Sequence, residues 1–184
     1  MRRIIGILLW VWMASCKFTT SHDIKIRGAL SQQQLDTLPD RMLVSNALQS
    51  IHYFVYELNR MKDFDYLTRG QQGLYHLSLL DSQLLKSGFL SYMKTNNGVV
   101  PEQLKTVFGL TGDSSALEIL QSGEKQFALY SDIADGRSDS VKDANVPLFA
   151  IFALDSTYNQ IRDESARKFA DYIRRNKYLF FEVK

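Results

Sequence analysis

The stretch "DRMLVSNALQSIHYFVYEL", residues 40–58, decides the fold class of this chain. Its apolar residues recur at spacings of three and four positions, which puts them on one face of a helix about four turns long. They are Leu43, Ala47, Leu48, Ile51, Phe54, Val55 and Leu58. The spacing predicts an amphipathic helix whose apolar stripe packs against a core.

The same periodicity continues on both sides of a break at Ser87-Gly88. Leucines follow the helical spacing from Leu67 to Leu85, and a short apolar segment at 89–93 then ends in the turn composition "TNNG". Glycine at the break indicates a boundary or kink. We expect two helices to meet there at a corner that Phe89 and Tyr92 fill.

Further start and stop signals predict more helices. Pro101 suits a first helical position, and Gly109 a stop. Ser115 and Glu118 have the spacing of a capping box, and Ser122-Gly123 indicates an interruption in the helix that follows. The breaker-rich segment "DIADGRSDSVKDANVP", residues 132–147, is predicted to be a surface loop.

The last part of the chain predicts two helices. "LFAIFALDSTYNQI", residues 148–161, is apolar enough for a central buried helix. The final helix starts with acids and carries Arg174 and Arg175 late, which suits the helix dipole, and Phe180 and Phe181 are expected to seal the core. We therefore predict a compact single-domain all-α bundle of about seven or eight helices.

The first residues, "RRIIGILLWVWMASCK" at 2–17, have a basic start and an apolar run from Ile4 to Met13. That run is roughly half of the ~20 residues that cross a bilayer, and the pattern is typical of a secretory signal peptide. Met13-Ala14-Ser15-Cys16 resembles the bacterial lipobox, which implies a diacylated Cys16 at the mature N-terminus. Cys16 is the sole cysteine. A plain signal peptide with an incidental cysteine and a short uncleaved anchor are the alternatives.

These features predict three segments: a signal peptide at 1–15, a lipidated cysteine and polar tether at 16–39, and the helical domain at 40–184. Lys17 after the cysteine resembles outer-membrane sorting, so we expect a lipid anchor facing the periplasm. Without Arg2 and Arg3 the mature chain has 20 basic and 20 acidic side chains. A nucleic-acid partner is not expected, because such proteins carry a basic excess.

No catalytic constellation is apparent in the sequence. His22, His52 and His76 lack a second ligand at metal spacing, and no serine stands in a nucleophile motif. Carboxylate pairs such as Asp63/Asp65 fit loops or helix starts. The late basic residues Arg174, Arg175 and Lys177 suit a helix C-terminus better than a phosphate or anionic-lipid site. We expect no metal, no cofactor and no enzyme.

The run from Ser78 to Gly123, "SLLDSQLLKSGFLSYMKTNNGVVPEQLKTVFGLTGDSSALEILQSG", resembles the centre of a small all-α domain family named after a bacterial DNA-mimic protein. Most members have no assigned function. The positions that match the family's pattern are Asp81, Ser87-Gly88-Phe89, Tyr92, Asn96, Gly98 and Leu104 to Gly112. The ending "LDSTYNQIRDESARKFADYIRRN" also resembles the end of the family's domain. The resemblance covers roughly residues 40 to 182. The founding member is acidic and cytoplasmic, whereas this chain is predicted to be neutral when mature and to be exported, so DNA mimicry is not carried over.

We thus predict a cell-envelope lipoprotein with a helical domain that binds another protein. The predicted binding surface comprises Lys86, Phe89, Tyr92, Asn96 and Asn97, with the 132–147 loop. An envelope hydrolase and an immunity-type protein that neutralises a toxin are the alternatives. An exposed apolar or aromatic patch would favour binding. A concave pocket with convergent titratable groups would favour an enzyme.

Overall fold

The computed structural model describes residues 28–137 and 145–183, and the prediction of an all-α fold is confirmed. The predicted signal peptide and Cys16 lie outside the described residues. The α-helices within them are α1 Gln32–Thr37, α2 Asp40–His52, α3 Arg69–Thr95, α4 Glu102–Thr111, α5 Ser114–Ala134, α6 Asn145–Arg175 and α7 Lys177–Phe180. A π-helix, η1 Tyr53–Glu57, and a 3-10 helix, η2 Met61–Tyr66, follow α2, and the strands are β1 Gly28–Leu30 and β2 Phe181–Val183.

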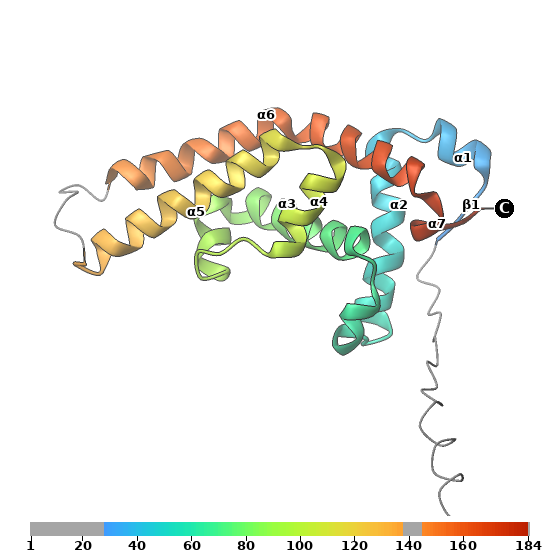
Figure 1. Ribbon diagram of the computed structural model, residues 1–184, viewed down its shortest axis with the longest axis horizontal. Coiled ribbons are helices and arrows are strands. Elements are labelled where there is room, and N and C mark those ends of the chain that lie inside the picture. The colour runs from blue at the N-terminus through green and yellow to red at the C-terminus, as the bar shows by residue number, and fades with distance from the viewer. Residues whose placement is uncertain (1–27, 138–144, 184) are drawn as a thin grey trace, which may run out of the picture.

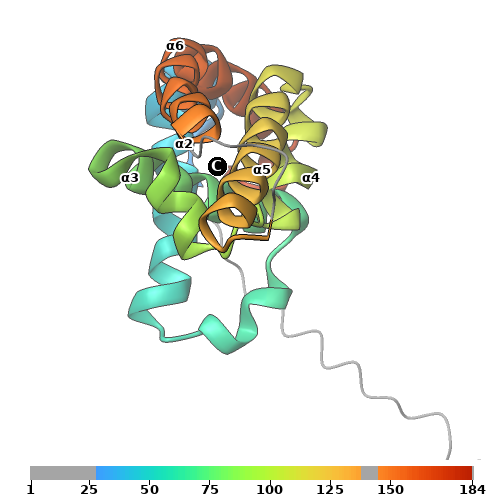
Figure 2. The ribbon, with the colours of Figure 1, turned by 90° about the vertical axis from the view of Figure 1, so that its left-hand side faces the viewer.

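The long helix α6 runs along the molecule, and α5 lies antiparallel beside it (Figure 1). Together α5 and the first half of α6 form an arm at the end of the molecule opposite β1 and β2. Helix α2 crosses the other end, and η1 and η2 project from it away from the α5–α6 pair (Figure 2). The domain therefore has two projecting parts, the arm and the η1–η2 turn.

The stripe at 40–58 packs as its spacing predicts. Leu43, Ala47, Ile51, Phe54 and Val55 are buried in the common core, and Leu48 packs partly against it. Leu58 is exposed, because the chain leaves the helical path at the end of η1. Phe180 and Phe181 are 2% and 1% exposed, so the prediction that they seal the core is confirmed.

The domain begins earlier than the sequence pattern predicts. Residues 28–30 pair in parallel with 181–183, so that Gly28 is opposite Phe181. Leu30 and Leu35 are buried, and the Ser31 and Gln34 side chains form a capping box at the start of α1. The predicted tether of 16–39 is therefore wrong over residues 28–39. Pairing between segments 153 positions apart, as for Gly28 and Phe181, leaves no local signal in the sequence.

Three predicted boundaries around α4 and α5 are also wrong. Helix α4 ends at Thr111, where Gly112 takes φ +70°, and not at Gly109. Helix α5 is capped by Asp113, whose side chain accepts the Ala116 N–H at 3.4 Å, so Ser115 lies inside the helix. The predicted interruption at Ser122-Gly123 does not occur. Glycine there serves packing, as described below.

Helix α6 replaces the two helices predicted after residue 147. It runs unbroken from Asn145 to Arg175. Its first half is not a central buried helix, because Ile151 is buried but Phe149 and Phe152 are 67% and 47% exposed. This stretch therefore has apolar side chains that are not buried in the core of the domain.

Candidate binding surfaces

The predicted corner at Ser87-Gly88 is present and has a packing role. Gly88 adopts φ +79° and ψ 172° inside α3. The Asp155 carboxylate of α6 accepts the N–H of the next residue, Phe89, at 2.7 Å. The Phe89 ring is fully buried on Gly123 of α5, so closely that a Cβ atom on Gly123 would lie 2.2 Å from it. The kink thus joins α3, α5 and α6.

This packing corrects the predicted binding surface. Phe89 and Tyr92 are 0% and 2% exposed, so they are core residues and offer a partner almost no area. Asn96 is half-buried and donates its amide to the Tyr92 carbonyl at 2.9 Å. Lys86 and Asn97 are exposed. The part of the predicted loop at 138–144 lies outside the described residues, and 132–134 belong to α5.

A hollow of about 280 Å³ lies between α3 and the start of α4. Tyr92 and Asn96 line it with His76, Leu79, Ser82, Gln83, Thr95 and Pro101. Burial lowers the pKa of His76, so the imidazole is neutral near pH 7. The lining supplies amide, hydroxyl and imidazole groups and no carboxylate.

A second hollow, of about 220 Å³, lies between α2, α3 and α6 and contains Asp81. Asp81 accepts a hydrogen bond from the Tyr158 hydroxyl at 3.0 Å and pairs with Arg162 at 3.3 Å. Burial, together with the negative charge and hydrogen bond of Asp81, raises the pKa of Tyr158 well above its ordinary value. Tyr158 therefore remains a protonated donor. The arrangement ties α3 to α6 and engages both oxygens of the carboxylate.

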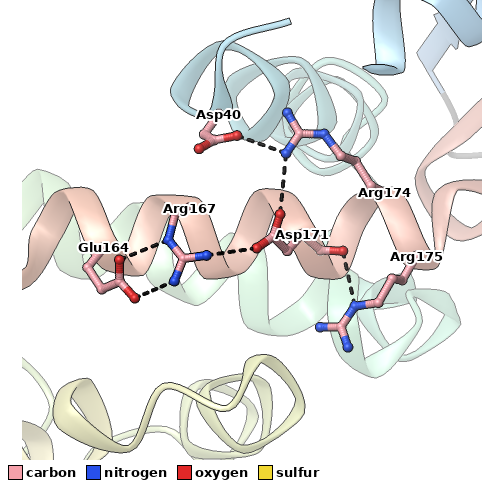
Figure 3. A network of polar contacts seen from close by, with 6 residues as sticks. All are labelled: Asp40, Glu164, Arg167, Asp171, Arg174 and Arg175. Carbon is pink, nitrogen blue, oxygen red and sulfur yellow. Dashed lines mark hydrogen bonds and ion pairs between the residues drawn. The ribbon is translucent and has the colours of Figure 1, made fainter. Parts of the chain in front are cut away.

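The basic residues late in α6 are engaged in a network with neighbouring groups (Figure 3). Arg174 donates to the Leu35 and Leu38 carbonyls at 3.2 and 3.0 Å and to Asp40 at 2.8 Å. These contacts satisfy carbonyls at the end of α1, which a helix end otherwise leaves unpaired. Arg175 donates to the backbone of Asp171 in its own helix. Arg174 thus fastens the N-terminal segment to α6.

Large apolar side chains are exposed along the arm. Val146, Phe149 and Phe152 follow one another at spacings of three on α6 and are 64%, 67% and 47% exposed. Leu129 of α5, 39% exposed, belongs to the antiparallel partner helix. We call Val146, Phe149 and Phe152 the arm stripe. Sequence reasoning placed 149 and 152 inside the core, because apolar composition alone does not show which face of a helix is covered.

A second exposed group occupies the η1–η2 turn, and sequence reasoning missed it. We call it the tyrosine tip: Tyr53, Tyr56, Leu58, Met61 and Tyr66, which are 46% to 64% exposed. Tyr53 and Tyr56 lie outside the apolar stripe of residues 40–58, which is the signal that could have found them. The π-helix that presents them is a rare element, often found at functional sites.

Comparison with known proteins defines the family. The family model described as DMP19-like protein matches residues 65–176, so this chain belongs to the DMP19-like family. No curated protein and no solved structure matches the chain. The match includes the Gly88 kink, Asp155 and the Asp81–Tyr158 pair, which carried the resemblance seen in the sequence. Of the helices within residues 28–137 and 145–183, none has the length and hydropathy of a membrane span.

Proposed function

We propose that this chain is a cell-envelope lipoprotein whose DMP19-like domain binds another protein through the arm stripe. The carrying observation is the exposure of Val146, Phe149 and Phe152 on one helix. Exposed apolar patches on folded domains mark interaction sites, because covering them with a partner removes apolar surface from water. Buried aromatic anchors are also the residues that dominate binding energies.

The compartment in this proposal rests on the N-terminal sequence. The basic start, the short apolar run and Cys16 after Ala14-Ser15 have the order of a lipobox signal. Two or more acyl chains on Cys16 give stable membrane attachment, which one chain does not. The balanced charge of the chain after residue 15 suits a protein partner better than nucleic acid.

The exposed arm stripe supports binding more directly than the hollows at Asp81 and His76 support hydrolysis. The Asp81 carboxylate is held by Tyr158 and Arg162, and the His76 hollow has no carboxylate in its lining. A general base must be free to take a proton from a bound substrate. The side chains of the arm stripe, by contrast, are not covered by other residues of the described chain.

Site-specific photo-crosslinking in the native host tests this proposal. A benzophenone amino acid replaces Phe149 in one strain and Leu85 of α3 in a matched control, since both side chains are 67% exposed. We expect irradiation to give one discrete larger species from position 149 and none from position 85. Adding Phe152→Ser is expected to reduce that species by roughly tenfold, as loss of an aromatic anchor costs more than about 1.4 kcal/mol.

Two outcomes would contradict protein binding at the arm. One is the absence of any species specific to position 149 while the protein is folded and membrane-associated. The other is a species that contains only two copies of this chain, because the arm stripe would then be a self-association surface. Circular dichroism of the Phe152→Ser protein checks that its helices are intact.

A further inference from the structure

The tyrosine tip has the chemistry of a membrane-interface surface. Tyr53, Tyr56 and Tyr66 are each more than half exposed, next to exposed Leu58 and Met61. A tyrosine ring has an apolar body and a hydroxyl that prefers water, which is why such rings gather at the level of lipid headgroups. The abundance of tyrosine in this exposed group therefore fits contact with the headgroup region of a membrane.

An aromatic cluster beneath the tip holds it in place. The Tyr56 hydroxyl is 2.9 Å from that of Tyr75, and the Tyr75 ring packs edge-on against Phe64 and His76. His52 completes the group through its ring contacts with Tyr56 and Tyr75. The tip is thus a preformed projection, and little ordering cost remains to be met on contact with another surface.

The described chain starts beside the base of this tip. Gly28 packs against Ser50 so closely that a Cβ atom on the glycine would lie 2.9 Å from the Ser50 hydroxyl. Ser50 lies in the last turn of α2, three positions before Tyr53. Residues 17–27 separate Cys16 from Gly28, and a segment of eleven residues spans at most about 40 Å. A lipid on Cys16 would therefore hold Gly28, at the base of the tip, within about 40 Å of the bilayer, which lets the tip reach it.

The charges around the tip include no basic excess: Arg60 and Asp63 cancel, and the exposed Glu57, Lys62 and Asp65 sum to −1. Arg60 pairs with Asp63 and lies 5.8 Å from the Phe54 ring centre, so it is engaged within the domain. Glu57, Lys62 and Asp65 are exposed. No basic excess exists here to favour anionic headgroups, which polybasic segments select. Attachment by aromatic and apolar contact fits this composition better than electrostatic attraction.

We propose that the tyrosine tip rests in the headgroup region of the membrane that carries the Cys16 anchor, and so orients the domain. This inference rests on the proposed lipid anchor. In the ribbon the tip and the arm are separate projections (Figure 1). Contact at the tip would fix the domain on the bilayer while leaving the arm stripe free for a protein partner.

Tryptophan fluorescence offers a clean test, because Trp10 and Trp12 are the only tryptophans and both precede Cys16. Tyr66→Trp places a reporter on the tip, and Phe149→Trp places a matched reporter on the arm, at 64% and 67% exposure. Each full chain is expressed in the native host and purified from its membranes. Mass spectrometry of the intact protein then establishes whether it is acylated. It is then reconstituted into vesicles of phosphatidylcholine brominated near the headgroup.

We expect bromine to quench the Tyr66→Trp protein about twofold or more and to leave the Phe149→Trp protein unchanged, because only interfacial rings contact the acyl region. Met61→Trp serves as a second tip reporter, so that the result does not depend on one substitution. In acylated protein, unquenched tip reporters, or equal quenching at the arm, would overturn the tip inference and leave the anchor standing. A processed chain whose mass shows no acyl group would overturn the anchor itself and, with it, this inference.

Discussion

The Asp155 carboxylate on α6 accepts the Phe89 backbone N–H at 2.7 Å, directly after the left-handed residue Gly88 of α3. This bond satisfies an N–H group that the kink removes from the regular helical pattern. It also places Phe89 against Gly123 of α5. Burial raises the pKa of Asp155, while the bond to Phe89 opposes that rise. The contacts of Phe89 with Asp155 and Gly123 therefore link α3, α6 and α5.

Gly88→Ala is expected to destabilise the domain by about 1–3 kcal/mol, because its combination of φ and ψ is almost exclusive to glycine. A Cβ atom there would also lie 3.0 Å from the Asp155 carboxylate. Gly109→Ala is the control, since Gly109 lies in α4 with nothing within 4 Å of its Cβ position. Urea unfolding should show a gain of roughly 0.5–1 kcal/mol for that control. Equal effects of the two substitutions would contradict the kink.

Gly123→Ala is expected to be destabilising by about 1–3 kcal/mol or more, because the new methyl group would overlap the Phe89 ring. Phe89→Leu shortens the side chain and should partly relieve the overlap. A double-mutant cycle on urea unfolding measures this coupling, which should exceed about 0.5 kcal/mol for residues in contact. Additive effects of the two substitutions would show that Phe89 does not pack on Gly123.

Arg174→Met retains the aliphatic stem but removes the hydrogen bonds to the Leu35 and Leu38 carbonyls and to Asp40. At about 1 kcal/mol for each bond, the expected loss is roughly 2–3 kcal/mol. Arg175→Met is the neighbouring control and should change stability by less than about 0.5 kcal/mol, because its side chain is exposed. Thermal melts of the two proteins compare them directly. Similar melting temperatures would mean that Arg174 does not fasten α1.

His76 should contribute to a loss of stability in mild acid. Burial lowers its pKa below the ordinary 6.5, so the unfolded chain takes up a proton at a higher pH than the folded one. The free energy of unfolding therefore falls as the pH drops below about 6.5 and continues to fall until the folded histidine is also protonated. His76→Gln should show a smaller decrease between pH 7 and pH 5 in urea titrations. An unchanged decrease would exclude His76 as a source.

Local pattern predicted the all-α class, the helix at Leu43 and the kink, since apolar spacing and glycine at position 88 act within a few residues. Pattern failed where distant contacts decide the structure. Gly123 is an ordinary breaker in sequence, yet it is glycine because Phe89 needs the space. The cap of α5 was assigned to Ser115 by its spacing to Glu118, whereas Asp113 follows the turn at Gly112 and provides the cap.

The candidate surfaces were harder to predict than the fold. Phe89 and Tyr92 stood out in the sequence as aromatic residues near a break, and the core uses both. Phe149 looked like core and is exposed, because α5 and the rest of the domain cover only the Ile151 face of α6. Tyr53 and Tyr66 carried no motif. The two residues lie on the same surface because η1 and η2 form one projection, which no local pattern in the sequence indicates.

The proposed lipid on Cys16 would place this DMP19-like domain in the envelope. Feeding alkyne-palmitate to the native host tests it most directly, with membrane fractionation of the same cells. We expect the wild-type protein to be labelled and recovered with membranes, and Cys16→Ser to give an unlabelled precursor that keeps residues 1–15. An unlabelled wild-type protein in the soluble fraction would contradict lipidation at Cys16.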